Sequence, residues 1–308
     1  MSDKMGVEEL QQIVSICLDE IEGLKQQNQM LVEAVKQLTV KVGQQDQELE
    51  QKYTQLRQRM YGFQCQDAYQ LNREKLLLRG YLSDDASKVP FTGKGVVYSA
   101  MTGNYDTVKE IQYKNPHLDY ILFTDNPNVR SSTWEVRLLE NSEGLDSVRL
   151  ARKAKILGHA LLADYDYSVW VDAKLEVVGD FEEYIQRYRG KRPLLCFPNF
   201  TNDCAYEEEK LCEALKKDRF DTMRAQMQKY QKEGYPAHNG MVETAILVRE
   251  IHNEEVIKVM ETWWNEIINH SYRDQLSFNY SCWKCDFLYD FTNLLIYMND
   301  YVVLHAHN

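Results

Sequence analysis

Asp172 is the residue at which ligand chemistry is first expected in this chain. It follows Tyr167 to Val171, a short aromatic and β-branched run that predicts a strand buried on both faces. In open α/β sheets, ligands collect outside the carboxyl ends of the strands, so a carboxylate here indicates metal or phosphate binding. Taken alone, an Asp after a strand more often begins a turn. The rest of the chain has to decide between these two interpretations.

A stripe of basic residues lies shortly before this strand. Arg149, Arg152, Lys155 and His159 are spaced by three, three and four residues, which places them on one side of a predicted helix. In a chain of net charge −11, a basic stripe beside a sheet edge indicates an anionic ligand such as a diphosphate. By spacing alone, a solvated charged face is an equally good interpretation.

Three further segments place ionisable side chains near predicted strand or helix ends. They are the loop of residues 238–243, the run 273–275, and the terminal His305 and His307. Each has a plain structural alternative. Asp274 fits a capping box that begins a helix, the carboxylate of the loop could pair with a nearby cation, and the two histidines could belong to an unstructured tail.

The elements that would position these residues alternate between strand and helix. Predicted strands cover residues 95–101, 119–125, 134–139, 167–171, 194–197 and 244–248, and predicted helices cover 146–162, 181–188, 206–232 and 254–268. This alternation predicts an α/β fold with a mostly parallel sheet. The sequence has no Gly-x-Gly-x-x-Gly and no Walker-type loop, which weakens dinucleotide-binding and kinase interpretations.

Composition narrows the class of protein. The 308 residues are 44% hydrophobic, enough for a packed core, and the net charge of −11 argues against nucleic acid as a partner. No apolar stretch is long enough to span a bilayer, so we expect no transmembrane segment. Seven scattered Cys suit a reducing compartment. We therefore expect a cytoplasmic protein.

The first eighty residues predict a coiled coil. Two apolar rows repeat every seven residues, with Leu10, Cys17, Leu24, Leu31 and Leu38 in the d row and Val14, Ile21, Val35 and Val42 in the a row. β-branched residues at a with Leu at d favour a parallel two-stranded coiled coil, and Asn28 in the a row would fix its register. We expect self-association as a dimer, with a trimer as the alternative. The predicted organisation is a stalk at 1–80, a linker at 81–92 and a domain at 93–308.

This domain resembles a known family. The match is carried by Tyr98-Ser-Ala-Met-Thr-Gly-Asn-Tyr-Asp106, Phe123-Thr-Asp125, Arg149-x-x-Arg-x-x-Lys155, Tyr165-Asp-Tyr-Ser-Val-Trp-Val-Asp172, Glu233-Gly-Tyr-Pro236, Gly240-Met-Val-Glu243 and Arg273-Asp-Gln-Leu-Ser-Phe278. Together these segments are similar to the glycosyltransferase-like domain of plant mucilage-related proteins and of many bacterial polysaccharide loci. The resemblance implies a GT-A fold, a Rossmann-like sheet that binds a nucleotide-sugar, most simply a UDP-sugar, and passes the sugar to a hydroxyl of a glycan acceptor.

The resemblance also implies roles for individual residues. Donor-binding positions would be Thr102, Asp125, Arg149, Lys155, Asp172, Lys174, Gly240 and Gln275. Of these, Thr102 and Asp125 would contact the nucleotide, and Arg149 and Lys155 the phosphates. Asp274 matches the catalytic-acid position, with Glu243 as a second catalytic carboxylate.

The metal-binding motif is where this chain departs from the family pattern. Such folds hold Mn²⁺ or Mg²⁺ on an Asp-x-Asp and a late His, which here implies Asp172 with His305 or His307. The third position of the motif is Lys174 instead of a carboxylate. A lysine ammonium could itself supply the positive charge to the diphosphate.

The resemblance thus implies a nucleotide-sugar-dependent glycosyltransferase, of the hexosyl or a related type, that acts in polysaccharide biosynthesis. Two alternatives belong to other classes. One is a non-catalytic sugar- or nucleotide-binding module on an oligomerising stalk, which Lys174 favours. The other is a metal-dependent hydrolase that uses Asp172 and the terminal histidines.

Overall fold

The computed structural model describes residues 6, 12, 22–39, 41–42, 67–81, 91–296 and 299–305. The chain divides into two units, Met1–Gln64 and Cys65–Asn308. Within the described residues, no helix is both long enough and apolar enough to cross a membrane.

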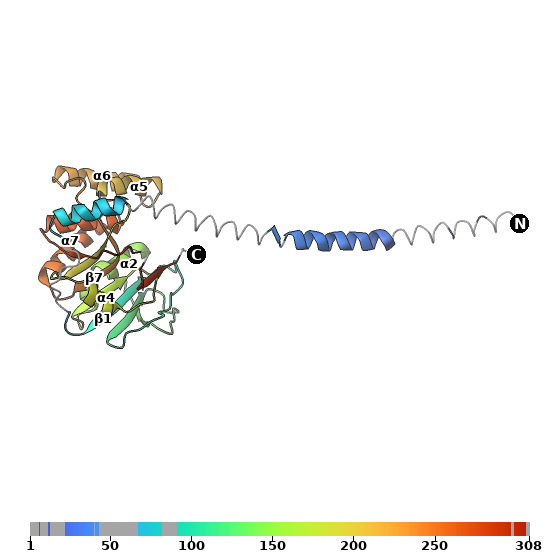
Figure 1. The fold of residues 1–308 in the computed structure, drawn as a ribbon, viewed down its shortest axis with the longest axis horizontal. Coiled ribbons are helices and arrows are strands. Elements are labelled where there is room, and N and C mark those ends of the chain that lie inside the picture. Colours follow the sequence, from blue (N-terminus) through green and yellow to red (C-terminus); the bar gives the residue numbers. More distant parts are fainter. Residues whose placement is uncertain are drawn as a thin grey trace. The chain divides into compact units, whose positions relative to one another are not determined.

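The described part of the first unit is helical over residues 22–39 and 41–42 (blue in Figure 1). Its apolar heptad residues Leu24, Leu31, Val35 and Leu38 are each more than half exposed. The helix agrees with the sequence prediction. Pairing between chains stays a prediction, because a single chain does not test it.

The second unit is built on one large sheet (Figure 1). In the described part of the chain, seven strands form it in the order β3-β2-β1-β4-β7-β6-β8. Their bounds are β1 Gly95–Met101, β2 Leu118–Thr124, β3 Glu135–Leu138, β4 Tyr167–Val171, β6 Leu194–Pro198, β7 Val242–Glu250 and β8 Asp290–Phe291. All neighbouring pairs are parallel except the two that involve β7. This arrangement confirms the mostly parallel, Rossmann-like α/β sheet.

Helices cover both faces of the sheet. Their bounds are α2 Ser147–Ile156, α3 Gly158–Leu161, α4 Phe181–Tyr188, α5 Ala205–Ala214, α6 Phe220–Lys232, α7 Glu254–Asn269 and α8 Asp274–Lys284. Alternate side chains of β4 enter different clusters: Trp170 packs with apolar residues of α2, α7 and α8, and Val169 packs with those of α4. The second cluster also includes residues of a small sheet of β5 (Leu175–Val177) and β9 (Val302–Leu304).

Two of the predicted helices are interrupted. The predicted helix 146–162 ends at Ile156 and restarts at Gly158, where a Cβ would lie 2.2 Å from the Tyr98 hydroxyl. The predicted helix 206–232 divides into α5 and α6 around Lys216, whose φ is +52°. Both breaks depend on packing and backbone geometry that helical periodicity does not reveal. The predicted N-cap of the first helix is confirmed, because the Asp146 side chain accepts a hydrogen bond from Arg149 N.

A helix at residues 67–78 (cyan in Figure 1) belongs to the second unit. Leu76 is fully buried in the same core cluster as Trp170, and Tyr81 stacks on Tyr289 with ring centroids 4.1 Å apart. The last residues of the predicted stalk at 1–80 therefore contribute to the core of the following unit.

Candidate active site

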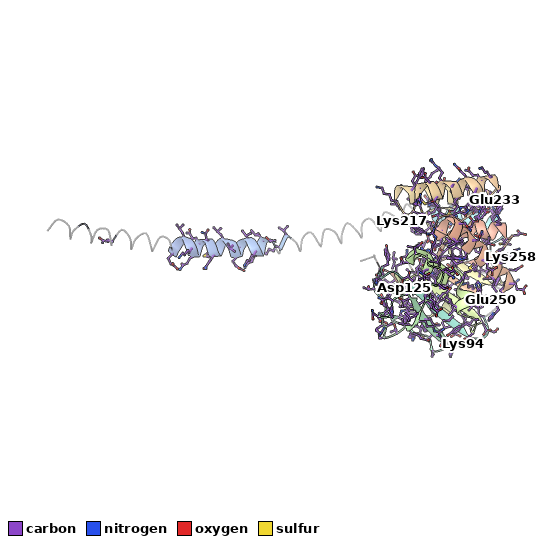
Figure 2. The ribbon with its side chains drawn as sticks, turned by 180° about the vertical axis from the view of Figure 1, so that it is seen from behind. Lys94, Asp125, Lys217, Glu233, Glu250 and Lys258 are labelled. Carbon is purple, nitrogen blue, oxygen red and sulfur yellow. The ribbon has the colours of Figure 1, made fainter. Side chains whose placement is uncertain are left out.

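The carboxyl edge of the sheet brings Asp172 next to the start of β7. Because β7 runs antiparallel to β4, its first residues lie beside the last residues of β4. The Asp172 N–H donates to Ala245 O at 2.8 Å, one residue beyond Thr244. The antiparallel strand thus gathers side chains that are about seventy residues apart in sequence. Figure 2 shows Asp125, which follows β2, and Lys94, which precedes β1, at different ends of the unit.

Lys155 links the acidic residues of this edge. Its side chain, on the last turn of α2, is fully buried. Nζ lies 2.5 Å from Asp274 Oδ2 and 3.3 Å from Asp172 Oδ1, and it donates to Thr244 Oγ1 at 3.1 Å. A buried ammonium requires this kind of compensation. Lys155 therefore fixes the two carboxylates relative to each other.

Asp274 is an ionised carboxylate at the N-terminus of α8. Burial alone would raise its pKa, but the positive charges of Arg152, Lys155 and Arg273 hold the pKa well below its usual range. Arg152 Nη2 lies 3.4 Å from Oδ1. A carboxylate held this strongly in its charged form is a weak base, so its chemistry is to anchor cations.

Glu243 has the opposite character. It lies near the start of β7, partly buried, and Oε1 accepts a hydrogen bond from Asn199 Nδ2 at 2.9 Å. Burial raises the pKa of Glu243 to about 7. The Lys174 ammonium opposes this rise, while three nearby carboxylates add to it, those of Glu208, Asp172 and Asp274. A carboxylate with a pKa near neutrality is suited to accept and release protons.

The predicted metal ligands do not form one group. Asp172 Oδ1 already accepts from Trp170 Nε1 at 2.8 Å and lies beside the Lys155 ammonium. His305 Nε2 instead lies 2.6 Å from Glu176 Oε2. His307 is outside the described residues. The donors around Asp172 thus fit an ammonium partner better than a divalent cation.

Several predicted donor-binding residues have structural partners of their own. Thr102 Oγ1 donates to Ser147 O at 2.6 Å, and both carboxylate oxygens of Asp125 accept from Gly103 N, at 3.0 and 3.1 Å. Arg149 pairs with its N-cap Asp146 at 2.8 Å, so it does not join Lys155 in the acidic cluster.

Gln275 and Gly240 flank the cluster. Gln275 Nε2 donates to Val242 O at 2.6 Å and is buried. Gly240 has φ +82° and lies against Leu76 of the 67–78 helix. Both residues hold the start of β7, and with it the backbone next to Glu243.

Arg152, Thr244 and Asn199 also contribute to the site, although the sequence did not single them out as site residues. Arg152 stands out in the sequence only as part of the basic stripe. Thr244 and Asn199 gave no signal, because their contacts to Asp274 and Glu243 join residues distant in sequence.

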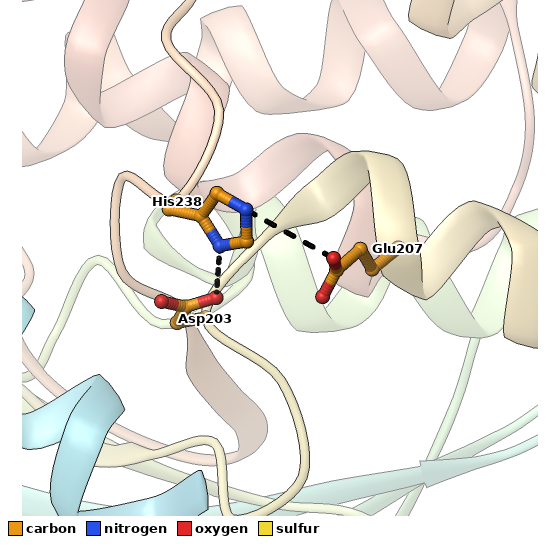
Figure 3. Close-up of side chains that lie close together, drawn as sticks. All are labelled: Asp203, Glu207 and His238. Carbon is orange, nitrogen blue, oxygen red and sulfur yellow. Dashed lines mark hydrogen bonds and ion pairs between the residues drawn. The ribbon is translucent and has the colours of Figure 1, made fainter.

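A second group of polar side chains is separate from the Lys155 cluster. Asp203, Glu207 and His238 are the three residues within the described part of the chain whose side chains could together ligate a metal ion (Figure 3). His238 Nδ1 lies 2.7 Å from Asp203 Oδ1, and Nε2 lies 3.9 Å from Glu207 Oε1. The short first distance describes a direct hydrogen bond between the buried Asp203 and the half-exposed His238.

The fold defines an α/β protein of the Rossmann-like type, with the candidate site at the carboxyl edge of the sheet. Within that class, the chain belongs to the family described as TOD1/MUCI70, glycosyltransferase-like domain, whose sequence model matches residues 92–303. This confirms the resemblance drawn from the sequence motifs.

A similar protein also supports a glycosyltransferase. The chain is similar to the probable hexosyltransferase MUCI70 of Arabidopsis thaliana, with 24% identity over 211 residues. The match covers 60% of this chain and 36% of that protein, so the chain spans little more than a third of the relative. Together, the family and this relative support a glycosyltransferase in general terms.

Proposed function

We propose that residues 93–308 transfer a sugar from a nucleotide-sugar donor, such as a UDP-sugar, to a hydroxyl group of a glycan acceptor. The observation that carries this proposal is Glu243, a carboxylate with a pKa of about 7 beside Asp172 and the Lys174 ammonium. A base and a cation at the carboxyl edge of a Rossmann-like sheet are what such a transfer requires. Family membership supports the same reaction class.

On the acceptor side, Glu243 serves as the general base. As the bond forms between the acceptor oxygen and the anomeric carbon, the hydroxyl proton passes to the Glu243 carboxylate. The bond from that carbon to the phosphate oxygen breaks, and its electron pair leaves with the nucleoside diphosphate. Of the two predicted catalytic carboxylates, Glu243 fits this role better, because Asp274 is held ionised by Lys155 and Arg152.

On the donor side, Lys174 supplies positive charge to the leaving diphosphate. Lys155 is fully buried against two carboxylates and one hydroxyl, so its part is to hold Asp172 in place. Asp172, with a side chain 20% exposed, is the member of this cluster that can reach a ligand.

A divalent cation, when bound, would likewise neutralise the diphosphate. The donor set around Asp172 does not fit such an ion, so no step is assigned to it. The requirement for Mn²⁺ or Mg²⁺ stays a prediction, and donor turnover in excess EDTA tests it. Full activity would mean that Lys174 has taken the place of the ion.

Donor turnover tests the proposed function. The full chain is incubated with a panel of UDP-, GDP- and CDP-sugars and simple sugar acceptors, and release of the nucleoside diphosphate is measured. We expect turnover of one donor class, and its loss in Asp172→Ala while the circular dichroism spectrum is kept. Asp221→Ala, an exposed residue of α6, is the matched control and should keep full activity.

The rival functions give different outcomes in the same assay. Donor binding without turnover by the wild-type chain would indicate a non-catalytic binding module. Metal-dependent cleavage of simple esters, without donor turnover, would indicate a hydrolase. Either result would overturn the proposed transferase function.

A further inference from the structure

We infer that Asn72, on the helix at residues 67–78, is a positioning residue for Glu243. Asn72 lies outside the family match at residues 92–303, so this part of the site comes from a segment that precedes the family domain. The inference rests on the proposed role of Glu243 as the base. It adds that a residue outside the family domain holds this base in position.

Asn72 holds two segments together. Its side chain is fully buried, and it makes three hydrogen bonds to backbone groups. Nδ2 donates to Asn199 O at 2.7 Å and to Met241 O at 2.8 Å, and Oδ1 accepts from Met241 N at 2.8 Å. A single carboxamide therefore joins the end of β6 to the residues just before Glu243.

Asn199 carries this contact to the carboxylate. Its Nδ2 donates to Glu243 Oε1 at 2.9 Å, while its Oδ1 accepts from Thr201 N and Asn202 N at 2.8 and 2.9 Å. Because the amide oxygen is occupied by backbone donors, the amide nitrogen must point at Glu243. The orientation of this donor depends on the backbone that Asn72 holds.

A second contact places the same helix against the same loop. Gly240 has φ +82°, and a Cβ there would lie 2.6 Å from Cδ2 of the buried Leu76. The Gly240 N–H donates to Asp203 O at 2.9 Å, which closes the loop on its other side. The backbone before Glu243 is thus fixed between the helix and the segment that begins α5.

Loss of the Asn72 side chain is expected to raise the pKa of Glu243. A hydrogen bond donated to a carboxylate favours its charged form, so a displaced Asn199 should raise the pKa of Glu243 above about 7. The inflection of the pH–rate profile should move to higher pH in Asn72→Ala. We expect kcat to fall roughly tenfold, with KM changed less than twofold, because the base and not the donor contact is disturbed.

The test compares three variants of the full chain: Asn72→Ala, Asn199→Ala and the double variant. If both residues act through one path, their effects on kcat are not additive, and the double variant resembles Asn199→Ala. Asn115→Ala removes a buried Asn whose side chain binds Asp180 and Glu182 elsewhere. This control should leave the inflection in place even if it lowers thermal stability.

A measurement without turnover separates this inference from the proposed function. The Glu243 carboxyl carbon is titrated by NMR in protein labelled at glutamate side chains, with Glu243→Gln identifying the signal. An unchanged Glu243 titration in Asn72→Ala would overturn the inference, whatever Asn199→Ala shows. If Asn72→Ala does not fold, Asn72→Asp takes its place, because it keeps the oxygen that accepts from Met241 N but loses both donated hydrogen bonds. Full turnover by Glu243→Gln would instead contradict the proposed base and leave the titration result standing.

Discussion

At the scale of residues, the site depends on a positive charge that α2 carries into the core. Lys155 is buried with Asp274, Asp172 and Thr244 as its partners. Such a cluster gives little net stability, because its three charged groups lose hydration, but removing one partner leaves charge uncompensated. Its value here is geometric, since it sets the position of Asp172 at the carboxyl edge of the sheet, where we propose that the donor binds.

Substitution at Asp274 tests this arrangement. Asp274→Asn keeps the shape of the side chain but removes the charge that faces Lys155 and Arg152. We expect the free energy of unfolding in urea to fall by about 3 to 5 kcal/mol. Lys153→Met breaks the more exposed pair with Glu143 and should cost less than about 1 kcal/mol. Equal losses in the two variants would contradict the special role of the buried pair.

At the scale of elements, the turn into β7 is the most constrained part of the site. Gly240→Ala forces an alanine into a left-handed backbone conformation, which costs about 1 to 2 kcal/mol, and pushes its Cβ against Leu76 for a further cost of about 1 to 3 kcal/mol. Gly234 has almost the same φ, +84°, but a Cβ there would meet nothing within 4 Å, so Gly234→Ala carries the backbone cost alone.

The difference between these two alanine variants, measured by chemical denaturation, isolates the contact with the 67–78 helix. A loss for Gly240→Ala no larger than that for Gly234→Ala would show that the helix does not restrain the turn.

The sequence predicted the helices and strands better than the side-chain contacts between them. The strand that ends just before Asp172 and the α/β class follow from local patterns, and the structure confirms both. The pairing of Lys155 with Asp274 joins residues 119 positions apart, and the basic stripe alone suggested a phosphate contact instead. The raised pKa of Glu243 depends on burial beside other carboxylates, which no spacing encodes. Residues 67–78 continued the helical pattern of the stalk, so their docking on the second unit was not expected.

At the scale of the whole molecule, we propose that the first unit joins chains through a parallel coiled coil. Light scattering on the full chain should give about twice the 36.3 kDa of one chain. Leu31→Glu with Leu38→Glu should return the mass to that of one chain, because both residues lie in the exposed apolar row. Gln37→Glu, on another face, should leave the assembly intact. Three times the single mass would support the trimer, and a wild-type chain with a single mass would contradict the proposal.

The most direct test of the proposed transferase is the pH dependence of donor turnover at Glu243. A general base must be ionised, so the wild-type rate should be low below the Glu243 pKa, rise through about pH 7 and level off above it. Glu243→Gln should lower the rate on the order of 10²- to 10⁴-fold and remove the rise. If Glu243→Gln turns the donor over at the wild-type rate at pH 8 and keeps the wild-type pH profile, Glu243 is not the general base.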